Sequence, residues 1–219
     1  MDELIELSSF KPFGKGGNRL CFVDPRDESR CIKVVLPHKT PNLKRANAPG
    51  LKRFRCLSYY DDNLRELETY HRIEASLTDK VWSNLPRCYG MVNTDLGAGI
   101  VTDVVRDYTG EISQSLRAKM RNEGSTLMIR EAVERFSAYL RETLLPTRDI
   151  LLHNLVAEVL DDRGRCELHV IDGFGSADMI PYAYWLKGLA RKKVERKLVK
   201  LNLKVATLIA EESLPCHHK

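Results

Sequence analysis

The sequence predicts an α+β chain of two lobes, with a β-rich first lobe of antiparallel strands and a minimal, mostly helical second lobe. Segments rich in β-branched residues, separated by glycine and proline turns, lie at residues 10–35 and 86–105, on either side of a proline-containing segment and one helical pattern. From Ser113 onward the pattern is helical apart from one hairpin. A chain of 219 residues suits one domain of two small lobes. We therefore expect a single domain over residues 1–219, with lobes at about 1–105 and 111–219 and a hinge at about 103–110.

The elements of the first lobe follow from alternating apolar residues and turn signals. Phe10 to Val35 predicts a strand, a glycine-rich turn, a strand, a turn and a third strand. Leu36 to Tyr60 contains three prolines, so we expect a loop. Asn63 to Leu77 repeats apolar residues at three- and four-residue steps, which is typical of an amphipathic helix. Pro86 to Val92 and Gly99 to Val105 add two strands, giving an antiparallel sheet of about five.

The second lobe begins with helices and contains one β-hairpin. Ile129 to Leu144 places apolar residues on one face of a helix, and a proline follows it. Leu155 to Val159 and Cys166 to Ile171 predict two short strands, joined by a turn at Asp161–Gly164. Pro181 to Glu212 predicts a final helix.

Composition excludes several classes of protein. No apolar run approaches the roughly 20 residues that span a bilayer, so we expect no membrane segment. The first residues lack the basic and apolar regions of a signal peptide, which predicts a cytoplasmic protein. The six cysteines form no CxxC pair, which argues against a zinc finger or a disulfide framework.

The net charge of +5 is unevenly distributed. Leu36 to Tyr60 holds six Lys and Arg residues and no acid. Lys187 to Lys204 holds eight, against Glu195 alone. The rest of the chain is therefore acidic. Two basic segments of this kind attract phosphate-bearing partners, although basic segments are also often solvated surfaces.

Three features of the first lobe are candidates for a binding site, although each alone is a weak signal. Gly14-Lys15-Gly16-Gly17 is a glycine turn between strands, whose N–H groups can approach phosphates closely, although a plain tight turn has the same composition. Lys33 lies inside an apolar strand, where it needs an anionic partner or an outlet to water. Glu66 lies on the following helix and is a candidate partner for Lys33, whereas Glu68 faces elsewhere on that helix.

Two further features lie in the second lobe. Asp149 and Asn154 are five residues apart in a segment between a helix and the hairpin. Asp172 follows the hairpin directly and is succeeded by Gly173-Phe174-Gly175. An aspartate that leaves a strand and is followed by glycine is well placed to hold a metal ion.

This ordered set resembles the protein kinase signature, which has a glycine-rich loop, a strand lysine, a helix glutamate, a catalytic loop and a metal-binding Asp-Phe-Gly motif. More closely, the chain resembles the YrbL family, a small bacterial group named for the PhoP regulatory network. The resemblance covers nearly the whole chain and is weakest at 39–59 and 117–130. It is strongest at Arg30–Val35, Arg65–Tyr70, Leu85–Gly99 and Ile180–Leu186.

The resemblance implies Mg²⁺ and ATP as cofactors, bound in a cleft between the lobes. Glycines of the turn cover the phosphates, the lysine holds them, and the glutamate orients the lysine. One aspartate orients the acceptor hydroxyl, while the other holds Mg²⁺ with the help of the asparagine. The backbone of 103–105 contacts adenine. In this sequence the implied residues are Gly14, Gly16, Gly17, Lys33, Glu66, Asp103, Val105, Asp149, Asn154 and Asp172.

The implied activity is transfer of the γ-phosphoryl group of ATP to a hydroxyl of unknown identity, on a small molecule or a protein. Three departures argue against a conventional protein kinase. Thr147 stands where histidine is usual, the metal motif is one residue longer than Asp-Phe-Gly, and no Ala-Pro-Glu motif follows Asp172. A small-molecule kinase, an unusual protein kinase and an ATP-binding regulator remain open.

Two alternatives to an active kinase remain. One is a pseudokinase, in which the ionic residues support the fold or sense ATP without catalysis. The other is a binding module, because Leu36 to Tyr60 interleaves arginines with aromatic residues in a way that suits nucleic acid. We prefer the kinase interpretation to the nucleic-acid one.

Overall fold

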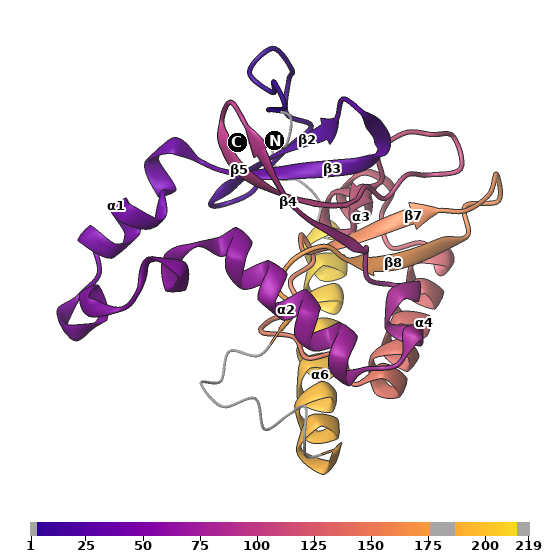
Figure 1. The fold of residues 1–219 in the computed structure, drawn as a ribbon. Coiled ribbons are helices and arrows are strands. Elements are labelled where there is room, and N and C mark those ends of the chain that lie inside the picture. The colour runs from indigo at the N-terminus through magenta and orange to yellow at the C-terminus, as the bar shows by residue number, and fades with distance from the viewer. Residues whose placement is uncertain (1–3, 176–186, 214–219) are drawn as a thin grey trace, which may run out of the picture. The chain divides into compact units, whose positions relative to one another are not determined.

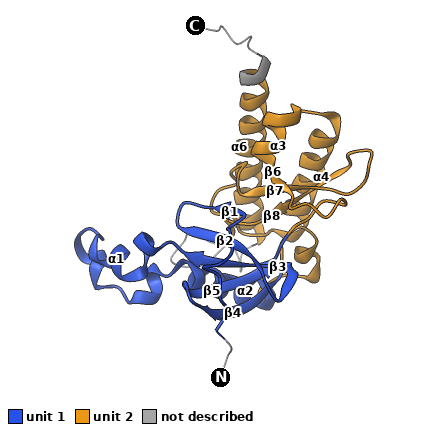
Figure 2. Cartoon of the chain, turned by 90° about the horizontal axis from the view of Figure 1, so that it is seen from above, with its two compact units in different colours: residues 1–75, 87–104 blue, residues 76–86, 105–219 orange. Residues whose placement is uncertain are grey.

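The computed structural model describes residues 4–175 and 187–213. The chain divides into two compact units, coloured separately in Figure 2. Unit 1 comprises residues 1–75 and 87–104, and unit 2 comprises residues 76–86 and 105–219. In the part of the chain that is described, no helix has the length and apolarity needed to cross a membrane.

Unit 1 contains a five-stranded antiparallel sheet in the order β1-β2-β3-β5-β4 (Figure 1). This confirms the predicted sheet. The first strand differs from the prediction: β1 is only two residues long and consists of part of the glycine turn itself, and before it only the Phe13 N–H still donates to the Cys21 carbonyl of β2, at 2.9 Å, among the described residues. The strands are β1 Gly14–Lys15, β2 Arg19–Asp24, β3 Asp27–Val35, β4 Cys88–Thr94 and β5 Gly97–Asp103.

The strand alternation separates an apolar face of this sheet from a polar one. Phe22, Ile32 and Val34 are buried in a core that also contains Ile5, Leu7 and Val101. Cys21 is the cross-strand partner of Lys33, so these two side chains share the opposite face. Helix α2 (Asp62–Ser76) contacts this second face through two of its side chains, described below, and confirms the predicted helix within one residue at each end.

The predicted loop at 36–60 is wrong, because the structure forms short helices there. Helix α1 spans Pro41–Ala46, and three 3₁₀ helices span Pro37–Lys39, Gly50–Phe54 and Leu57–Tyr60. Pro37 and Pro41 are the first residues of two of these helices, and Pro49 immediately precedes a third. Proline fits the first helical position because its missing N–H would have had no helical partner there.

Unit 2 contains a three-stranded sheet in the order β6-β7-β8, with helices around it (Figure 1). The predicted helix after residue 129 and the predicted hairpin are confirmed. Strand β6 and helix α3 were not predicted separately. A two-residue strand is too short to show a periodic pattern. The described elements are the 3₁₀ helix Asp79–Ser83, β6 Gln114–Ser115, α3 Leu116–Glu123, α4 Leu127–Thr143, β7 Leu155–Val159, β8 Cys166–Val170 and α6 Lys187–Ser213.

Side-chain caps define the starts of helices α3 and α4. The hydroxyl of Ser115 accepts a hydrogen bond from the Ala118 N–H at the start of α3, and Thr126 does the same for α4. Helix α4 ends where Leu144 adopts a left-handed conformation with φ 53°. The predicted final helix is present from Lys187, and its first six predicted positions lie outside the described residues.

Candidate functional site

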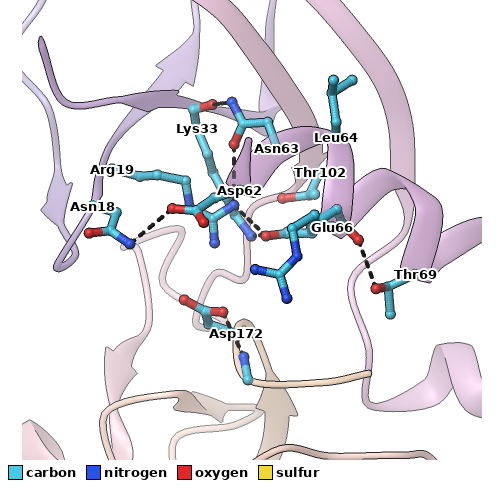
Figure 3. Close-up of polar contacts among 12 residues, drawn as sticks. Asn18, Arg19, Lys33, Asp62, Asn63, Leu64, Glu66, Thr69, Thr102 and Asp172 are labelled. Atoms are coloured by element: carbon cyan, nitrogen blue, oxygen red, sulfur yellow. Dashed lines mark hydrogen bonds and ion pairs between the residues drawn. The ribbon is translucent and has the colours of Figure 1, made fainter. Parts of the chain in front are cut away.

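Unit 1 brings Lys33 and Glu66 together as a buried ion pair. The Lys33 Nζ lies 2.9 Å from Glu66 Oε1, and the two side chains are 8% and 7% exposed (Figure 3). Strand β3 presents the lysine on the polar face of the sheet, and α2 presents the glutamate. The start of α2 is fixed by Asp61, whose carboxylate accepts hydrogen bonds from the N–H groups of Asn63 and Leu64.

Two residues that the sequence did not single out complete this cluster. Arg19, on β2, donates to Glu66 Oε2, so the same carboxylate contacts two cations. The Asn63 amide donates to the backbone oxygens of Lys33 at 3.0 Å and Ala98 at 3.1 Å, which ties α2 to the sheet. The sequence signal for Arg19 was its position two residues before Cys21, the cross-strand partner of Lys33. Because side chains alternate with a period of two along a strand, Arg19 and Lys33 lie on the same face of the sheet.

Lys33 and Glu66 both remain ionised although their side chains are buried. Burial raises the pKa of Glu66, but the charges of Lys33 and Arg19 and their hydrogen bonds outweigh it and lower the pKa to about 2. Burial lowers the pKa of Lys33, and the charge of Glu66 reverses this, so the pKa is raised. Both groups are therefore ionised near neutral pH, and the cluster presents positive charge on a fixed, poorly hydrated support.

The backbone conformation and the packing of the predicted glycine turn do not by themselves require glycine at Gly17. Gly16 donates its N–H to the Arg19 carbonyl at 2.9 Å, and Gly14 belongs to β1. Neither Gly14, Gly16 nor Gly17 has a positive φ. A Cβ added at Gly17 would have no heavy atom within 4 Å. The fold therefore tolerates a side chain here, and any requirement for glycine must come from something that approaches the backbone.

The predicted hinge residues Asp103 and Val105 lie on either side of the unit boundary. The Asp103 carboxylate accepts hydrogen bonds from the Arg87 N–H and the Tyr89 hydroxyl, each at 2.7 Å. Its side chain therefore organises the end of β5. Across residues 4–175 and 187–213, the N–H of Val105 has no hydrogen-bond acceptor, whereas its carbonyl accepts from the Ser113 N–H. A donor of this kind is available to a ligand.

Unit 2 brings the two predicted acidic segments side by side. The Arg148 N–H donates to the Gly173 carbonyl at 2.7 Å, and the Ile171 N–H donates to the Asn154 carbonyl at 3.0 Å. The Gly175 N–H donates to the Pro146 carbonyl at 2.7 Å. These backbone bonds join the segment that carries Asp149 and Asn154 to the segment that carries Asp172.

Gly173 is the point of closest approach between these segments. Its φ is +76°, and a Cβ at this position would lie 2.8 Å from Asn154 Nδ2 and 2.9 Å from the Asp149 carbonyl oxygen. Its N–H donates to Asp172 Oδ1 at 2.6 Å, which holds the Asp172 carboxylate (Figure 3). The inserted glycine is thus accommodated in a turn, and Phe174 follows it into the interior at 3% exposure, bridged to Thr147.

Two lysines of α6 contact the Asp149 segment and were not among the predicted site residues. Lys204 Nζ lies 3.4 Å from Asp149 Oδ1 and donates to the Ile150 carbonyl at 3.1 Å. Lys197 donates to the Arg148 carbonyl. The sequence marked α6 as a basic helix but gave no sign of its partner, because such a contact depends on tertiary packing.

Unit 2 offers oxygen donors of the chemical type that a magnesium ion prefers. Among the described residues, no three His, Cys, Asp or Glu side chains gather in a group suited to a metal. Mg²⁺ prefers oxygen ligands and commonly keeps several waters while bound by one or two carboxylates. The Asp172 carboxylate and the Asn154 amide oxygen belong to two segments that pack tightly at Gly173, and both are oxygen donors of the type that Mg²⁺ prefers.

The fold is that of the protein-kinase-like class, as predicted. The crystal structure of Rad53 1-466 in complex with AMP-PNP matches 95% of this chain with a TM-score of 0.52 and 14% sequence identity. The chain spans about half of that protein, 52% of its length. The β-rich unit with its strand lysine and helix glutamate, and the unit with the paired acidic segments, are the parts that define this class.

The chain belongs to the YrbL family. The family model described as PhoP regulatory network protein YrbL matches residues 5–206. Two curated relatives named "Uncharacterized protein YrbL", from Escherichia coli (strain K12) and Shigella flexneri, are each 31% identical over 196 residues. Each alignment covers 88% of this chain and 84% of the relative. The resemblance drawn from the sequence is confirmed.

Proposed function

We propose that this chain binds Mg·ATP and transfers the γ-phosphoryl group to a hydroxyl acceptor. The observation that carries the proposal is the buried cluster of two cations on one carboxylate in unit 1. Burying ionised groups is costly even when they are paired, and apolar replacements are often at least as stable. A lysine fixed in this way is well suited to bind phosphate oxygens. The shared fold supports the proposal, because Rad53 carries AMP-PNP in its crystal structure.

In this proposal unit 1 supplies the nucleotide contacts. Lys33 binds phosphate oxygens, and Glu66 holds the ammonium in position through the 2.9 Å contact. The backbone of the glycine turn approaches the phosphates, and there is space for them at Gly17, where an added Cβ would have no heavy atom within 4 Å. Adenine is held by the backbone at Asp103 and Val105, where the Val105 N–H is an available donor.

Unit 2 supplies the groups for the transfer. Asp172 and Asn154 are the residues that would hold Mg²⁺, which neutralises phosphate charge when bound. Asp149 accepts the hydrogen bond of the acceptor hydroxyl and orients its oxygen. That oxygen forms a bond to the γ-phosphorus as the bond from phosphorus to the β,γ-bridging oxygen breaks. ADP leaves with the electron pair, and the hydroxyl proton passes to Asp149 and then to solvent.

The proposal predicts that Asp172→Asn loses the thermal stabilisation by ATP with Mg²⁺. A ligand at a hundred times its dissociation constant stabilises the native state by about 2.7 kcal/mol. For a chain of this size we expect the wild type to gain roughly 5–10 °C in melting temperature. The measurement is a thermal shift with and without Mg²⁺. Asp162→Asn, at an exposed position of the β7–β8 turn, is the control and should behave as wild type. An unshifted wild type contradicts the proposal.

A second test uses the glycine turn. Gly17→Ala should leave the free energy of unfolding within about 0.5 kcal/mol of wild type, because the added Cβ meets nothing. If phosphates approach the backbone here, the same methyl group weakens ATP binding by roughly tenfold, the cost of about one hydrogen bond. Calorimetric titration with ATP and Mg²⁺ measures this. Gly188→Ala, also in open space, should change neither affinity nor fold. Equal ATP affinity for Gly17→Ala and wild type removes the turn from the proposed site.

The regulator alternative is separated from the kinase by product formation. A pseudokinase binds ATP with the same thermal shift but forms no phosphorylated product. The measurement is transfer of radiolabelled phosphate from γ-labelled ATP to each member of a panel of metabolites and proteins. Asp149→Asn is the matched variant. Transfer that persists unchanged in Asp149→Asn argues against the role given to this carboxylate.

A further inference from the structure

Helix α6 presents a row of lysines beside the Asp149 segment. Lys197, Lys200 and Lys204 are spaced by three and four residues, so they lie on one face of the helix. Lys197 and Lys204 contact that segment directly, through the Arg148 carbonyl, the Asp149 carboxylate and the Ile150 carbonyl. The row therefore faces the part of unit 2 to which the acceptor hydroxyl is assigned.

The position of α6 within unit 2 is well fixed. Its apolar side packs inward, with Val194, Leu198 and Leu201 buried. Arg141 of α4 forms an ion pair with Glu195 at 2.8 Å, and Figure 2 shows the two helices side by side. The lysine row follows from this arrangement, because it lies next to the buried stripe.

The row holds more positive charge than the Asp149 carboxylate balances. Lys200 is exposed, and no ion pair joins it to another side chain among residues 4–175 and 187–213. Burial lowers the pKa of Lys197, the charge of Asp149 opposes this, and the neighbouring cations of α6 lower the pKa further. Lys200 and Lys204 thus repel the Lys197 ammonium, and Lys197 and Lys204 both interact with the Asp149 carboxylate.

We propose that Lys197, Lys200 and Lys204 form an anion subsite next to Asp149, and that the acceptor is a small hydroxyl compound bearing a phosphate or a carboxylate. This inference rests on the proposed function and names its acceptor class. Lys200 binds the anionic group, while Lys204 and Asp149 meet the hydroxyl end. The transfer itself is unchanged: the acceptor oxygen bonds to the γ-phosphorus, and ADP leaves.

The dimensions favour a small molecule. From Lys197 to Lys204 the helix rises about 10 Å at 1.5 Å per residue, which is the length of one phosphorylated metabolite and much less than a nucleic-acid backbone site. Three ammonium groups also repel a lysine- or arginine-rich peptide. A neutral alcohol gains no charge-based binding energy from the lysine row.

The first arm of the test measures binding without catalysis. Inorganic phosphate and acetate are titrated against the full chain carrying isotope-labelled lysine, and the side-chain signals are followed by NMR. We expect phosphate to shift the signals of Lys197, Lys200 and Lys204. Lys200→Ala should weaken binding about fivefold and Lys200→Glu about twentyfold, with Lys200→Arg close to wild type. Arg191→Ala, an exposed position on another face of α6, is the control.

The second arm measures transfer from labelled ATP to acceptors in matched pairs: glycerol with glycerol 3-phosphate, glucose with glucose 6-phosphate, and glycerol with glycerate. The anionic member should react at least tenfold better, and Lys200→Ala should reduce that ratio by raising KM. Equal rates within the pairs, or a preference for a protein or nucleic-acid acceptor, overturn the inference. If ATP produces no thermal shift, the proposed function fails, and the phosphate titration still decides whether the subsite exists.

Discussion

Replacing Glu66 with alanine is expected to lower the free energy of unfolding by about 3–5 kcal/mol, the cost of removing one partner from a buried ion pair. The reason is that Lys33 and Arg19 share this carboxylate and are themselves buried. The measurement is urea unfolding followed by far-UV circular dichroism. Hydrogen exchange of the β3 amides shows in addition whether the loss lies in unit 1.

The matched control is Glu68→Ala on the same helix. Glu68 is 62% exposed and pairs across one helical turn with Arg72, so its loss should cost about 0.5 kcal/mol or less. A second variant, Lys33→Met, removes one cation and leaves Arg19 on the carboxylate. It should cost less stability than Glu66→Ala while abolishing the thermal shift by Mg·ATP. If Glu66→Ala is as mild as Glu68→Ala, the carboxylate does not hold the cluster.

The same carboxylate makes stability depend on pH in the acid range. Its pKa is about 2 in the folded chain against an ordinary value of 4.5. A lowered folded pKa means that the unfolded chain binds more protons, so the contribution is complete above pH 4.5 and is lost as pH falls towards 2. The contribution of this group is on the order of 3 kcal/mol. Unfolding measured at several pH values should therefore show a shallower acid slope for Glu66→Gln than for wild type.

Gly173→Ala is expected to destabilise unit 2 by about 2–4 kcal/mol and to separate the acidic segments. Two effects add. The φ of +76° is unfavourable for alanine, and the new Cβ would lie 2.8 Å from Asn154 Nδ2 and 2.9 Å from the Asp149 carbonyl oxygen. Backbone bonds fix both segments, so they cannot move apart without losing contacts such as that between Arg148 and Gly173.

Gly164→Ala is the control that separates the steric contact at Gly173 from the backbone strain of a positive φ. Gly164 has a φ of +77°, almost the same as Gly173, but a Cβ there would have no neighbour within 4 Å. Its substitution should cost only about 1 kcal/mol. Thermal and urea unfolding compare the two variants, and the Asn154 side-chain amide signal in NMR should move in Gly173→Ala alone. Equal costs for the two glycines contradict the close packing of the acidic segments.

The sequence by itself determined the fold class and most elements of both units. Period-two alternation gave the sheet of unit 1, and apolar steps of three and four gave α2 and α4, because these patterns arise from local backbone geometry. The candidate residues Lys33, Glu66 and Asp172 were found through their order and their element context. The prediction failed at 36–60, where prolines start short helices, and at β6, which is too short to carry a pattern.

Only the tertiary structure decided which charged side chains, distant in the sequence, form ion pairs with one another. That Arg19 joins Lys33 on Glu66 depends on the cross-strand register and on how α2 lies on the sheet. That α6 sets its lysines against Asp149 depends on the burial of its apolar stripe, which fixes the rotation of the helix. Contacts across long sequence separations follow from packing of whole elements, and residue order along the chain does not contain that information.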